Sequence, residues 1–516
     1  MLARVQSLGL RGVEGFPVFV ELDLAGGLPS FSTVGLPDST VRESRERVTS
    51  AVRNSGFKFP SRRITVNLSP ARPRKEGSHY DLPIALAVLA ASGQAPAGDW
   101  AKSWCFVGEL SLDGRVRPVS GVLAMAESAR AEGYTAIVVP SENADEAAAA
   151  GLRALPVDDL RQAVRLLGGE APHARGAAAP ILAPRQEPAS GDLSEVRGQS
   201  LAKRALEIAA AGGHNLLLIG PPGTGKSMIA RRLPGLLPPM SEAEAVEVTK
   251  VQSACGRPPS GGLVRTRPFR APHHACSAAA LVGGGPAARA GEVCLAHGGV
   301  LFLDELTEFS RPSLEALRQP LEDRFVRVAR ARESLEYPSR FMLVAAANPC
   351  PCGYLGHPQK ACSCPPRAVE RYLNRLSGPL LDRIDIQIEM GPVDFADWAS
   401  SAKVSAGDTS AAVRERVVAA RARQTVRWSE GPATANAFVE PAQLRKKGRV
   451  SSQAYATLEA AQRMAAFSAR SLDRVLRVAR TIADLGGSAE VGASHVAEAV
   501  QFRSLDKLRS YLSQQR

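Results

Sequence analysis

The sequence predicts an α/β protein with a phosphate-loop nucleotide-binding core and a helical lid, preceded by an α+β domain. Three observations predict this class. The apolar residues 215–219 have the pattern of a buried strand and lead through a glycine-rich loop into a helical pattern. Residues 18–24 and 63–68 alternate apolar and polar side chains, as half-buried strands do. Residues 441–513 are rich in alanine, leucine and arginine, which favours helices.

The glycine-rich loop fits the phosphate-binding pattern G-x-x-x-x-G-K-[ST] at every fixed position. It also lies between a strand and a helix, as that pattern requires. The loop consists of Gly220, Pro221, Pro222, Gly223, Thr224, Gly225, Lys226 and Ser227. Its glycines let backbone N–H groups and the positive end of the helix face nucleotide phosphates. Lys226 is expected to reach the β- and γ-phosphates of ATP, and Ser227 is expected to hold Mg²⁺.

A second apolar strand pattern, at residues 299–303, ends in Asp304 and Glu305. An apolar run before two acids is common in α/β proteins, but this run follows a phosphate loop, as the Walker B strand of a nucleotide site does. Asp304 is expected to orient Mg²⁺ through its water shell, and Glu305 to polarise the water that attacks the γ-phosphate.

Length and composition bound the organisation of the chain and its location. Its 516 residues suggest about three domains. An alanine- and proline-rich stretch divides the chain, so the expected parts are residues 1–168, a linker at 169–191, the nucleotide core at 192–392 and a helical region at 393–516. No apolar run is long enough to span a membrane, and the first residues do not form a secretion signal, so a cytoplasmic protein is expected.

The chain is basic. Lysine and arginine outnumber aspartate and glutamate by 64 to 51, which gives a net charge of +13. An excess of positive charge favours a polyanionic partner such as DNA. Because bacteria with GC-rich genomes also make arginine-rich proteins, the charge alone is weak support.

Two pairs of cysteines, Cys350 with Cys352 and Cys362 with Cys364, bracket a short loop that contains His357. Four thiolates match the tetrahedral coordination of Zn²⁺, and a metal would hold a loop that has no core of its own. The spacing is tighter than that of the usual C-x₂-C knuckle, and His357 could replace one thiolate. Plain thiols and a redox pair are the alternatives.

The N-terminal part resembles the proteolytic domain of Lon-type proteases in two motifs, residues 75–81 and 108–119. In that family a serine in the first motif and a lysine shortly after the second form the catalytic dyad. Here His79 stands at the serine position and Leu123 at the lysine position, so nucleophile and base are both missing. The neighbouring Ser78 has no lysine partner. A copy of the fold without protease activity is therefore expected.

The nucleotide-binding part is similar to AAA+ ATPases of the magnesium-chelatase and MCM branch. The resemblance implies that Asn348 is sensor 1, which positions the attacking water, and that Arg383 is an arginine finger acting on a neighbouring subunit's nucleotide. It also implies that Arg470 is sensor 2 on the lid. Asn348 could instead be a plain turn residue. Arg474 and Arg477 recur at helical spacing, which leaves the choice of Arg470 open.

The same branch places insertions in the pore of its ring. Residues 325–340 look like two strands joined by a basic turn, in which Arg330 and Arg332 would contact DNA phosphates. An exposed charged turn is the alternative. The loop that contains His273 and His274 would form a second insertion, and the sequence leaves open whether these histidines have a ligand.

Across nearly the whole chain, the combined motifs resemble the bacterial magnesium-chelatase-like ATPases called YifB or ComM. The most specific are N-P-C-P-C-G at 348–353 and S-A-R at 468–470, followed by residues 478–485. The resemblance implies a hexameric, ATP-driven DNA motor, a branch-migration helicase that acts in homologous recombination of incoming DNA during natural transformation. The alternative is a protein-remodelling ATPase related to the motor subunit of magnesium chelatase.

Overall fold

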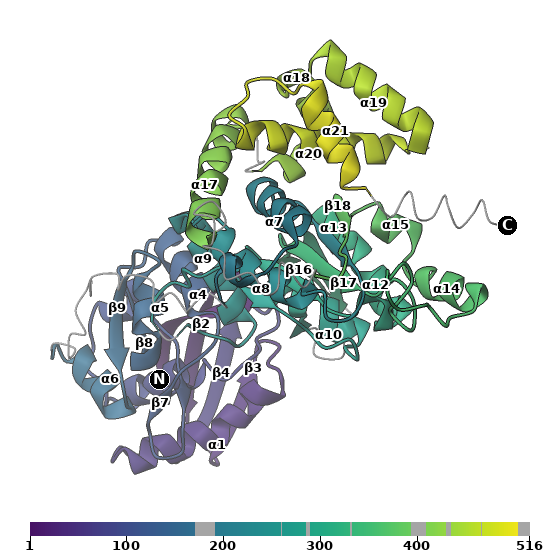
Figure 1. The fold of residues 1–516 in the computed structure, drawn as a ribbon. Coiled ribbons are helices and arrows are strands. Elements are labelled where there is room, and N and C mark those ends of the chain that lie inside the picture. The colour runs from purple at the N-terminus through teal and green to yellow at the C-terminus, as the bar shows by residue number, and fades with distance from the viewer. Residues whose placement is uncertain are drawn as a thin grey trace. The chain divides into compact units, whose positions relative to one another are not determined.

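The protein is described by a computed structural model. It describes residues 1–170, 191–259, 261–284, 289–330, 333–393, 409–429, 435–465 and 467–503. The chain forms two compact units (Figure 1). The first unit comprises Met1–Arg185, Met240–Arg265 and Ala329–Tyr337. The second unit comprises Gln186–Pro239, Thr266–Val328 and Pro338–Arg516. Within the described residues, no helix is both long and apolar enough to cross a membrane. Nearly all of the expected linker lies outside the described residues, and the predicted domain boundaries stay predictions.

The first unit contains a four-stranded sheet with the order β1-β2-β4-β3. β1 (Leu2–Arg11), β2 (Glu14–Ala25) and β4 (Arg63–Ser69) are antiparallel, and β3 (Ser30–Val34) runs parallel to β4. Both alternating patterns seen in the sequence are confirmed as strands. The apolar helix α2 (Asp81–Ala91) is buried in the core beside this sheet. Period-two alternation therefore leaves one face of each strand for the core.

A smaller parallel sheet completes the first unit. It has the order β5-β8-β9, and a hairpin of β6 and β7 lies apart from it. The remaining elements are β5 (Trp104–Phe106), β6 (Glu109–Leu110), β7 (Val116–Arg117), β8 (Ala136–Pro140), β9 (Arg153–Val157), α1 (Ser39–Asn54), α3 (Trp100–Ser103), α4 (Val122–Ala131), α5 (Ala144–Ala148), α6 (Leu160–Leu167) and α9 (Glu242–Ala254). The late segment α9 joins this unit through Lys250, whose Nζ lies 2.7 Å from Glu127, and through Ser253, whose Oγ accepts from Gly121 N at 2.7 Å.

The second unit is built on a five-stranded parallel sheet with the order β11-β14-β17-β10-β18. Its strands are β10 (Leu216–Ile219), β11 (Phe269–Arg270), β14 (Val300–Leu303), β17 (Met342–Ala347) and β18 (Ile386–Glu389). Every residue of β10, β14 and β17 is buried, which explains their unbroken apolar sequences. The two strands predicted at residues 215–219 and 299–303 are confirmed as β10 and β14. Because the strands are parallel, their carboxyl ends meet at one edge of the sheet.

Short elements surround this sheet. They are α7 (Ser200–Gly212), α8 (Lys226–Leu236), α10 (Ala278–Val282), α11 (Glu292–Leu295), α12 (Arg311–Ala316), α13 (Arg318–Asp323), α14 (Pro366–Leu373), α15 (Gly378–Leu381), β12 (Gly283–Gly284) and β13 (Arg289–Ala290). The predicted hairpin is present as β15 (Phe325–Arg330) and β16 (Glu333–Pro338). Arg332 and the side chain of Arg330 lie outside the described part of the chain.

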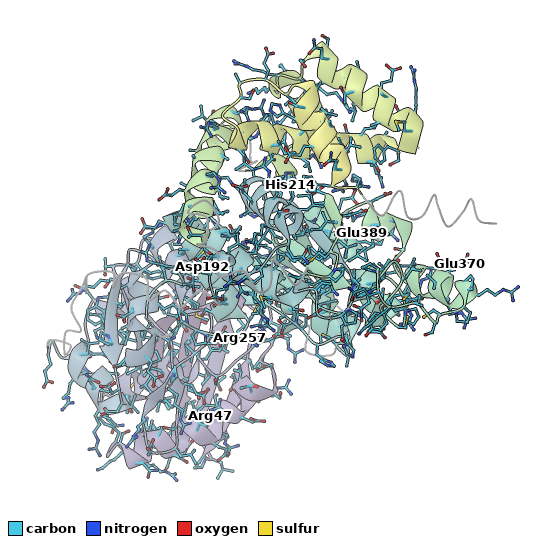
Figure 2. All side chains as sticks on the ribbon, in the orientation of Figure 1. Arg47, Asp192, His214, Arg257, Glu370 and Glu389 are labelled. Atoms are coloured by element: carbon cyan, nitrogen blue, oxygen red, sulfur yellow. The ribbon has the colours of Figure 1, made fainter. Side chains whose placement is uncertain are left out.

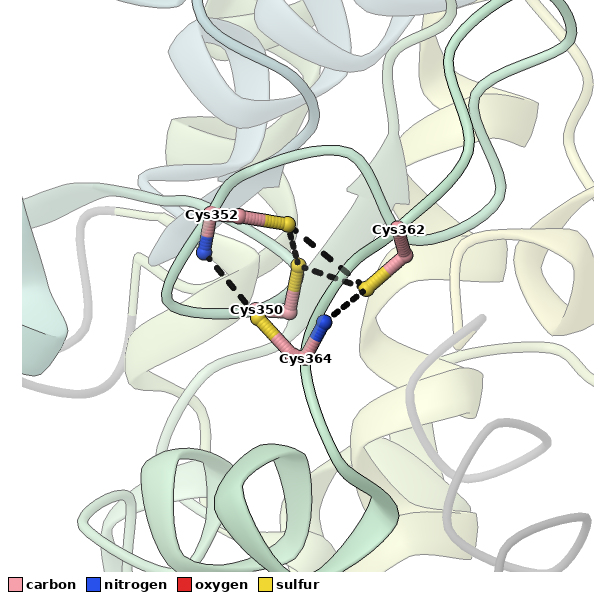
Figure 3. Close-up of side chains that lie close together, drawn as sticks. All are labelled: Cys350, Cys352, Cys362 and Cys364. Atoms are coloured by element: carbon pink, nitrogen blue, oxygen red, sulfur yellow. Dashed lines mark hydrogen bonds between the residues drawn. The ribbon is translucent and has the colours of Figure 1, made fainter.

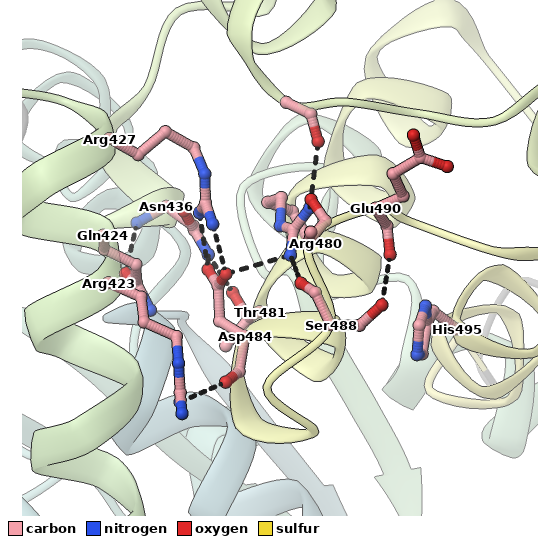
Figure 4. Close-up of polar contacts among 12 residues, drawn as sticks. Arg423, Gln424, Arg427, Asn436, Arg480, Thr481, Asp484, Ser488, Glu490 and His495 are labelled. Carbon is pink, nitrogen blue, oxygen red and sulfur yellow. Dashed lines mark hydrogen bonds and ion pairs between the residues drawn. The ribbon is translucent and has the colours of Figure 1, made fainter.

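The lid is helical as predicted where it is described. It contains α17 (Ser410–Arg427), α18 (Pro441–Lys447), α19 (Ser452–Ala465), α20 (Ala469–Leu485) and α21 (Ala493–Gln501). A buried polar network ties α17 to α20 (Figure 4). Arg480 is fully buried and donates to Asp484 and to three backbone carbonyls, while Asp484 also accepts from Arg427 and Asn436. Buried charges are tolerated here because each is paired and hydrogen-bonded.

Candidate functional site

The phosphate loop joins β10 to α8. Gly223 and Gly225 have φ angles of +81° and +87°, and a Cβ atom on either would meet no neighbour within 4 Å. Glycine adopts this left-handed backbone at little cost. At Gly220 a Cβ atom would lie 2.4 Å from the carbonyl oxygen of Met390, so only glycine fits there. The loop therefore curls in front of the N-terminus of α8, which is the geometry that binds phosphate groups.

The side chain of Lys226 is held along this loop. Its Nζ donates to the carbonyl oxygens of Gly220 and Pro221 at 2.6 and 2.8 Å, and to Asn348 Oδ1 at 3.2 Å. Burial lowers the pKa of Lys226, and the charge of Asp304 opposes that shift. The ammonium group thus lies where an anionic ligand would meet it.

Three of the predicted site residues lie together: Ser227 in the first turn of α8, and Asp304 and Glu305 directly after β14. Ser227 Oγ donates to Asp304 Oδ2 at 2.6 Å, and Asp304 Oδ1 accepts from the Glu305 backbone N–H at 3.0 Å. A hydroxyl group beside a carboxylate is the pair that holds Mg²⁺ at a phosphate loop, so the residues present fit a Mg²⁺–nucleotide complex.

Glu305 follows β14 in a left-handed conformation with φ of +51°, and its side chain is 56% exposed. His274 Nδ1 lies 3.0 Å from Glu305 Oε2. The neighbouring His273 instead accepts a hydrogen bond from the backbone of Ala275 at 3.2 Å. The structure therefore separates two histidines that the sequence did not distinguish, and it brings only His274 to the acid.

Arg383 and Arg470 lie together, apart from the phosphate loop. Both line a hollow of about 290 Å³ in the second unit, and no residue of the phosphate loop lines it. The Arg383 guanidinium donates to Glu322 and to the carbonyl of Pro379. Its Nε is buried without a hydrogen-bond partner. Further charged residues line the hollow: Arg324, Arg340, Arg474, Arg477, Glu322, Asp382, Asp385 and Asp473.

The buried carboxylate of Asp385 fixes the lid side of this hollow. It accepts from Arg474 at 2.6 Å and from the backbone N–H of Asn215 at 3.2 Å, and His214 Nδ1 lies 3.4 Å away (His214 is labelled in Figure 2). Burial acts to raise the pKa of Asp385, but the charge of Arg474 and the contact with His214 hold it well below its usual range. The lid helix α20 is thereby tied to the end of β10.

The four clustered cysteines meet in space (Figure 3). Their Sγ atoms all lie within 4.8 Å of one another. Backbone N–H groups donate to three of the sulfurs: Leu355 to Cys350, Cys352 to Cys364, and Cys364 to Cys362, at 3.3, 3.3 and 3.4 Å. Backbone donors from Tyr354 and Ser363 lower the pKa of the Cys352 thiol to about 6. His357 Nδ1 accepts from two backbone N–H groups of its own turn, and His357 is not in the sulfur cluster.

The Lon-like positions of the first unit have a different character. His79 is buried, and burial lowers its pKa to about 4, so its ring is neutral at pH 7. Leu123 is fully buried in an apolar cluster. Ser78 Oγ donates to the carboxylate of Glu109. Neither dyad position carries the serine hydroxyl group or the lysine amine that the Lon-type reaction uses.

The pairing of His274 with Glu305 is a feature that sequence reasoning missed. β11 and β14 are parallel, with Arg270 beside Leu301. The segments that follow these two strands bring His274 beside Glu305, four residues after Arg270 and Leu301. β11 is only two residues long and is flanked by prolines, so no strand pattern in the sequence could have set that register.

Comparisons with known proteins cover almost the whole chain. Family models match residues 192–398 (magnesium chelatase, subunit ChlI), 20–143 (subunit ChlI of Mg-chelatase) and 407–503 (magnesium chelatase, subunit ChlI C-terminal). The chain is 44% identical to the uncharacterized protein YifB of Escherichia coli K12 over 513 residues, 99% of each chain. It is 42% identical to the competence protein ComM of Haemophilus influenzae over 517 residues, again 99% of each. A Lon protease of Salinispora arenicola is 24% identical over 202 residues, 38% of this chain and 24% of that protein.

Proposed function

The chain belongs to the magnesium-chelatase-like family of YifB and ComM, an AAA+ family, and from that premise we propose that it is a ring-shaped, ATP-driven DNA motor. In this proposal it is a branch-migration helicase that acts in the cytoplasm on incoming DNA during natural transformation. The observation that carries the ATPase part is the contact set of Ser227 with Asp304 and Lys226 with Asn348. The net charge of +13 and the competence protein among the relatives support the DNA part.

The residues take complementary roles in hydrolysis. Lys226, Ser227 and Asp304 hold Mg·ATP, in which Mg²⁺ would neutralise charge on the β- and γ-phosphates. Glu305 accepts the proton of the attacking water, because its carboxylate is exposed beside this group of side chains. Asn348 orients that water from the end of β17, where it already contacts Lys226.

Arg383 and Arg470 serve a neighbouring subunit's nucleotide. They line one hollow that no phosphate-loop residue lines, which is expected if they complete a site in trans. Charge that develops on the γ-phosphate in the transition state would be stabilised by Arg383. Such an arrangement needs a closed ring, and we propose a homohexamer.

DNA-dependent hydrolysis tests the proposal. ATP turnover is measured with and without forked or three-stranded DNA, on the wild type and on a variant with Arg330→Ala and Arg332→Ala in the basic hairpin. The control carries Arg62→Ala and Arg63→Ala, which removes the same charge from exposed positions of the first unit. We expect DNA to stimulate the wild type and the control but not the hairpin variant. The DNA affinity of the hairpin variant should also depend less on salt. The slope of log K against log [salt] should become shallower by about 0.7 to 0.9 for each phosphate contact that is lost.

The alternative is a protein-remodelling ATPase, which the matches to magnesium-chelatase models favour. Hydrolysis that no DNA structure stimulates would support it and would contradict the DNA motor. We also propose that the four clustered cysteines bind a structural Zn²⁺, because four thiolates at these separations suit its tetrahedral coordination.

A further inference from the structure

We propose that the metal site formed by Cys350, Cys352, Cys362 and Cys364 controls ATP hydrolysis, because it fixes the phosphate loop and the residues around it. The proposal rests on the proposed ATPase function and goes beyond it. It makes turnover depend on a second metal ion that never touches the nucleotide. Loss of Zn²⁺, or oxidation of the thiols, should therefore switch the nucleotide site off.

The sulfur geometry fits one Zn²⁺ ion. At a Zn–S distance of about 2.3 Å, the edge of a tetrahedron of sulfurs is about 3.8 Å. The separations between Cys350, Cys352 and Cys362 Sγ are 3.4 to 3.6 Å, and the whole set lies within 4.8 Å. The three backbone N–H groups that donate to sulfurs would stabilise thiolates, as donors around metal-bound cysteines do.

The first cysteine pair forms a turn that presses on the phosphate loop. Gly353 N donates to the carbonyl of Cys350 at 2.9 Å, which closes the turn. A Cβ atom on Gly353, whose φ is +82°, would lie 2.7 Å from Pro222 Cδ and 3.9 Å from Asn348 Cγ. The Gly353 backbone therefore lies against Pro222 of the phosphate loop, and Asn348, which contacts Lys226, is close to the same turn.

The second cysteine pair leads into α14, which contacts the segment after Glu305. The side chains of Val369, Tyr372 and Leu373 on α14 pack against Cys350 in one cluster. Thr307 Oγ1 donates a hydrogen bond to the Tyr372 hydroxyl group at 2.5 Å. Arg375, just after α14, donates to the Thr307 carbonyl oxygen at 2.8 Å. The first end of the cysteine loop thus lies against the phosphate loop, and the second end contacts the segment that follows Glu305.

This arrangement makes the metal a structural constraint on catalysis. Apart from the cysteines, the apolar cluster around Cys350 contains, among the described residues, Val369, Tyr372, Leu373 and Leu355, so packing alone holds the loop weakly. Without a metal ion no common ligand holds the four sulfurs together, and the turn can move away from Pro222. A displacement of about 1 Å at groups that position a reaction can lower its rate about 100-fold.

A pair of glycine variants separates the contact from the metal. Gly353→Ala keeps all four cysteines but forces a Cβ atom against Pro222. Gly356→Ala, three residues further along the same loop, imposes the same backbone strain (φ +76°) with no neighbour within 4 Å. Zinc is measured by mass spectrometry, nucleotide affinity with a fluorescent ATP analogue, and kcat at saturating ATP. We expect about one Zn²⁺ per chain in both variants, and a kcat at least about tenfold lower in Gly353→Ala than in Gly356→Ala.

The joint variant Cys352→Ser with Cys362→Ser should lose zinc and show the same fall in kcat, and Zn²⁺ returned to chelator-treated wild type should restore turnover. Equal kcat in the two glycine variants would overturn the coupling. Fewer than about 0.3 Zn²⁺ per wild-type chain, purified without chelator, would overturn the metal site. If the wild type hydrolyses no ATP, the proposed function fails instead. The zinc content and the nucleotide affinity of Gly353→Ala then still decide whether the metal loop shapes the phosphate loop.

Discussion

The two units of this protein each contain a site whose backbone resembles that of an enzyme, but only one of the sites has reactive side chains in place. In the second unit, Ser227 meets Asp304 and Lys226 meets Asn348 at the edge of a parallel sheet. In the first unit, the Lon-like dyad positions hold a buried neutral histidine, His79, and a buried leucine, Leu123. The two sites therefore differ in the side chains at the positions that the two resemblances single out.

The difference lies in what each side chain can do with a proton. A lysine or carboxylate that lies partly exposed beside a phosphate loop can bind charge and exchange protons. The apolar side chain of Leu123 cannot, and the nearby carboxylate of Glu146 accepts a hydrogen bond from the Leu123 backbone N–H at 3.0 Å. The side chains that remain at the Lon-like positions pack the core of the first unit, which accounts for their burial.

The largest effect that would test this comparison is expected at Glu305. Glu305→Gln removes the proton acceptor but keeps the shape of the side chain, so ATP should still bind while kcat falls about 100- to 10,000-fold. Turnover is measured with a coupled phosphate assay and binding with a fluorescent ATP analogue. Arg383→Ala should show the same split between binding and turnover, because that residue acts on charge that develops during hydrolysis.

Glu308→Gln is the matched control for Glu305→Gln. Glu308 lies three residues further along, and its side chain is 45% exposed and pairs with Arg375 at 3.4 Å. The same chemical change there should leave kcat within about twofold of the wild type, since surface ion pairs contribute little. Wild-type turnover in Glu305→Gln would show that another group accepts the proton, and the contrast between the two units would then lose its main support.

A smaller effect is expected at His274, which we interpret as a positioning residue for Glu305. His274→Ala frees the Glu305 carboxylate to adopt other rotamers. We therefore expect kcat to fall about three- to tenfold while the KM for ATP stays nearly constant. His273→Ala is the control, because His273 contacts the backbone of Ala275 and not the acid. His274→Asn, which keeps a hydrogen-bonding group, should recover part of the change. Identical kinetics in the His273 and His274 variants would contradict this role.

The nucleotide site could be predicted from the sequence to a large extent, for a physical reason. Each of its residues follows a strand whose apolar sequence marks complete burial, and parallel strands bring their carboxyl ends together. The cysteine cluster was predictable for a similar reason, since close spacing keeps Cys350 and Cys352 near each other in any conformation. In these cases local sequence determines the neighbours.

The remaining features depend on contacts between distant segments, which no local pattern reports. Arg383 and Arg470 share one hollow because the lid is tied to the core through Asp385, 89 residues from its partner Arg474. The segment Met240–Arg265 belongs to the first unit although it follows the phosphate loop. The pairing of His274 with Glu305 depends on the register of a two-residue strand. A single sequence records the residues in each case but not their partners.

The smallest effect is expected at Ser78, the only serine in the motif 75–81, next to the position that the dyad serine would occupy. Its Oγ donates to the carboxylate of Glu109, which is a weak base, the adjacent His79 has a pKa lowered to about 4 by burial, and the buried Leu123 replaces the lysine, so the lysine-assisted activation of a serine is lost. Ser78→Ala should therefore change neither ATP turnover, beyond about twofold, nor the hydrolysis of labelled casein, which should be absent in both proteins. ATP-dependent casein cleavage by the wild type that disappears in Ser78→Ala would mean that the first unit has kept protease activity. Both units would then be catalytically active, and they would differ only in the substrate that each one cleaves.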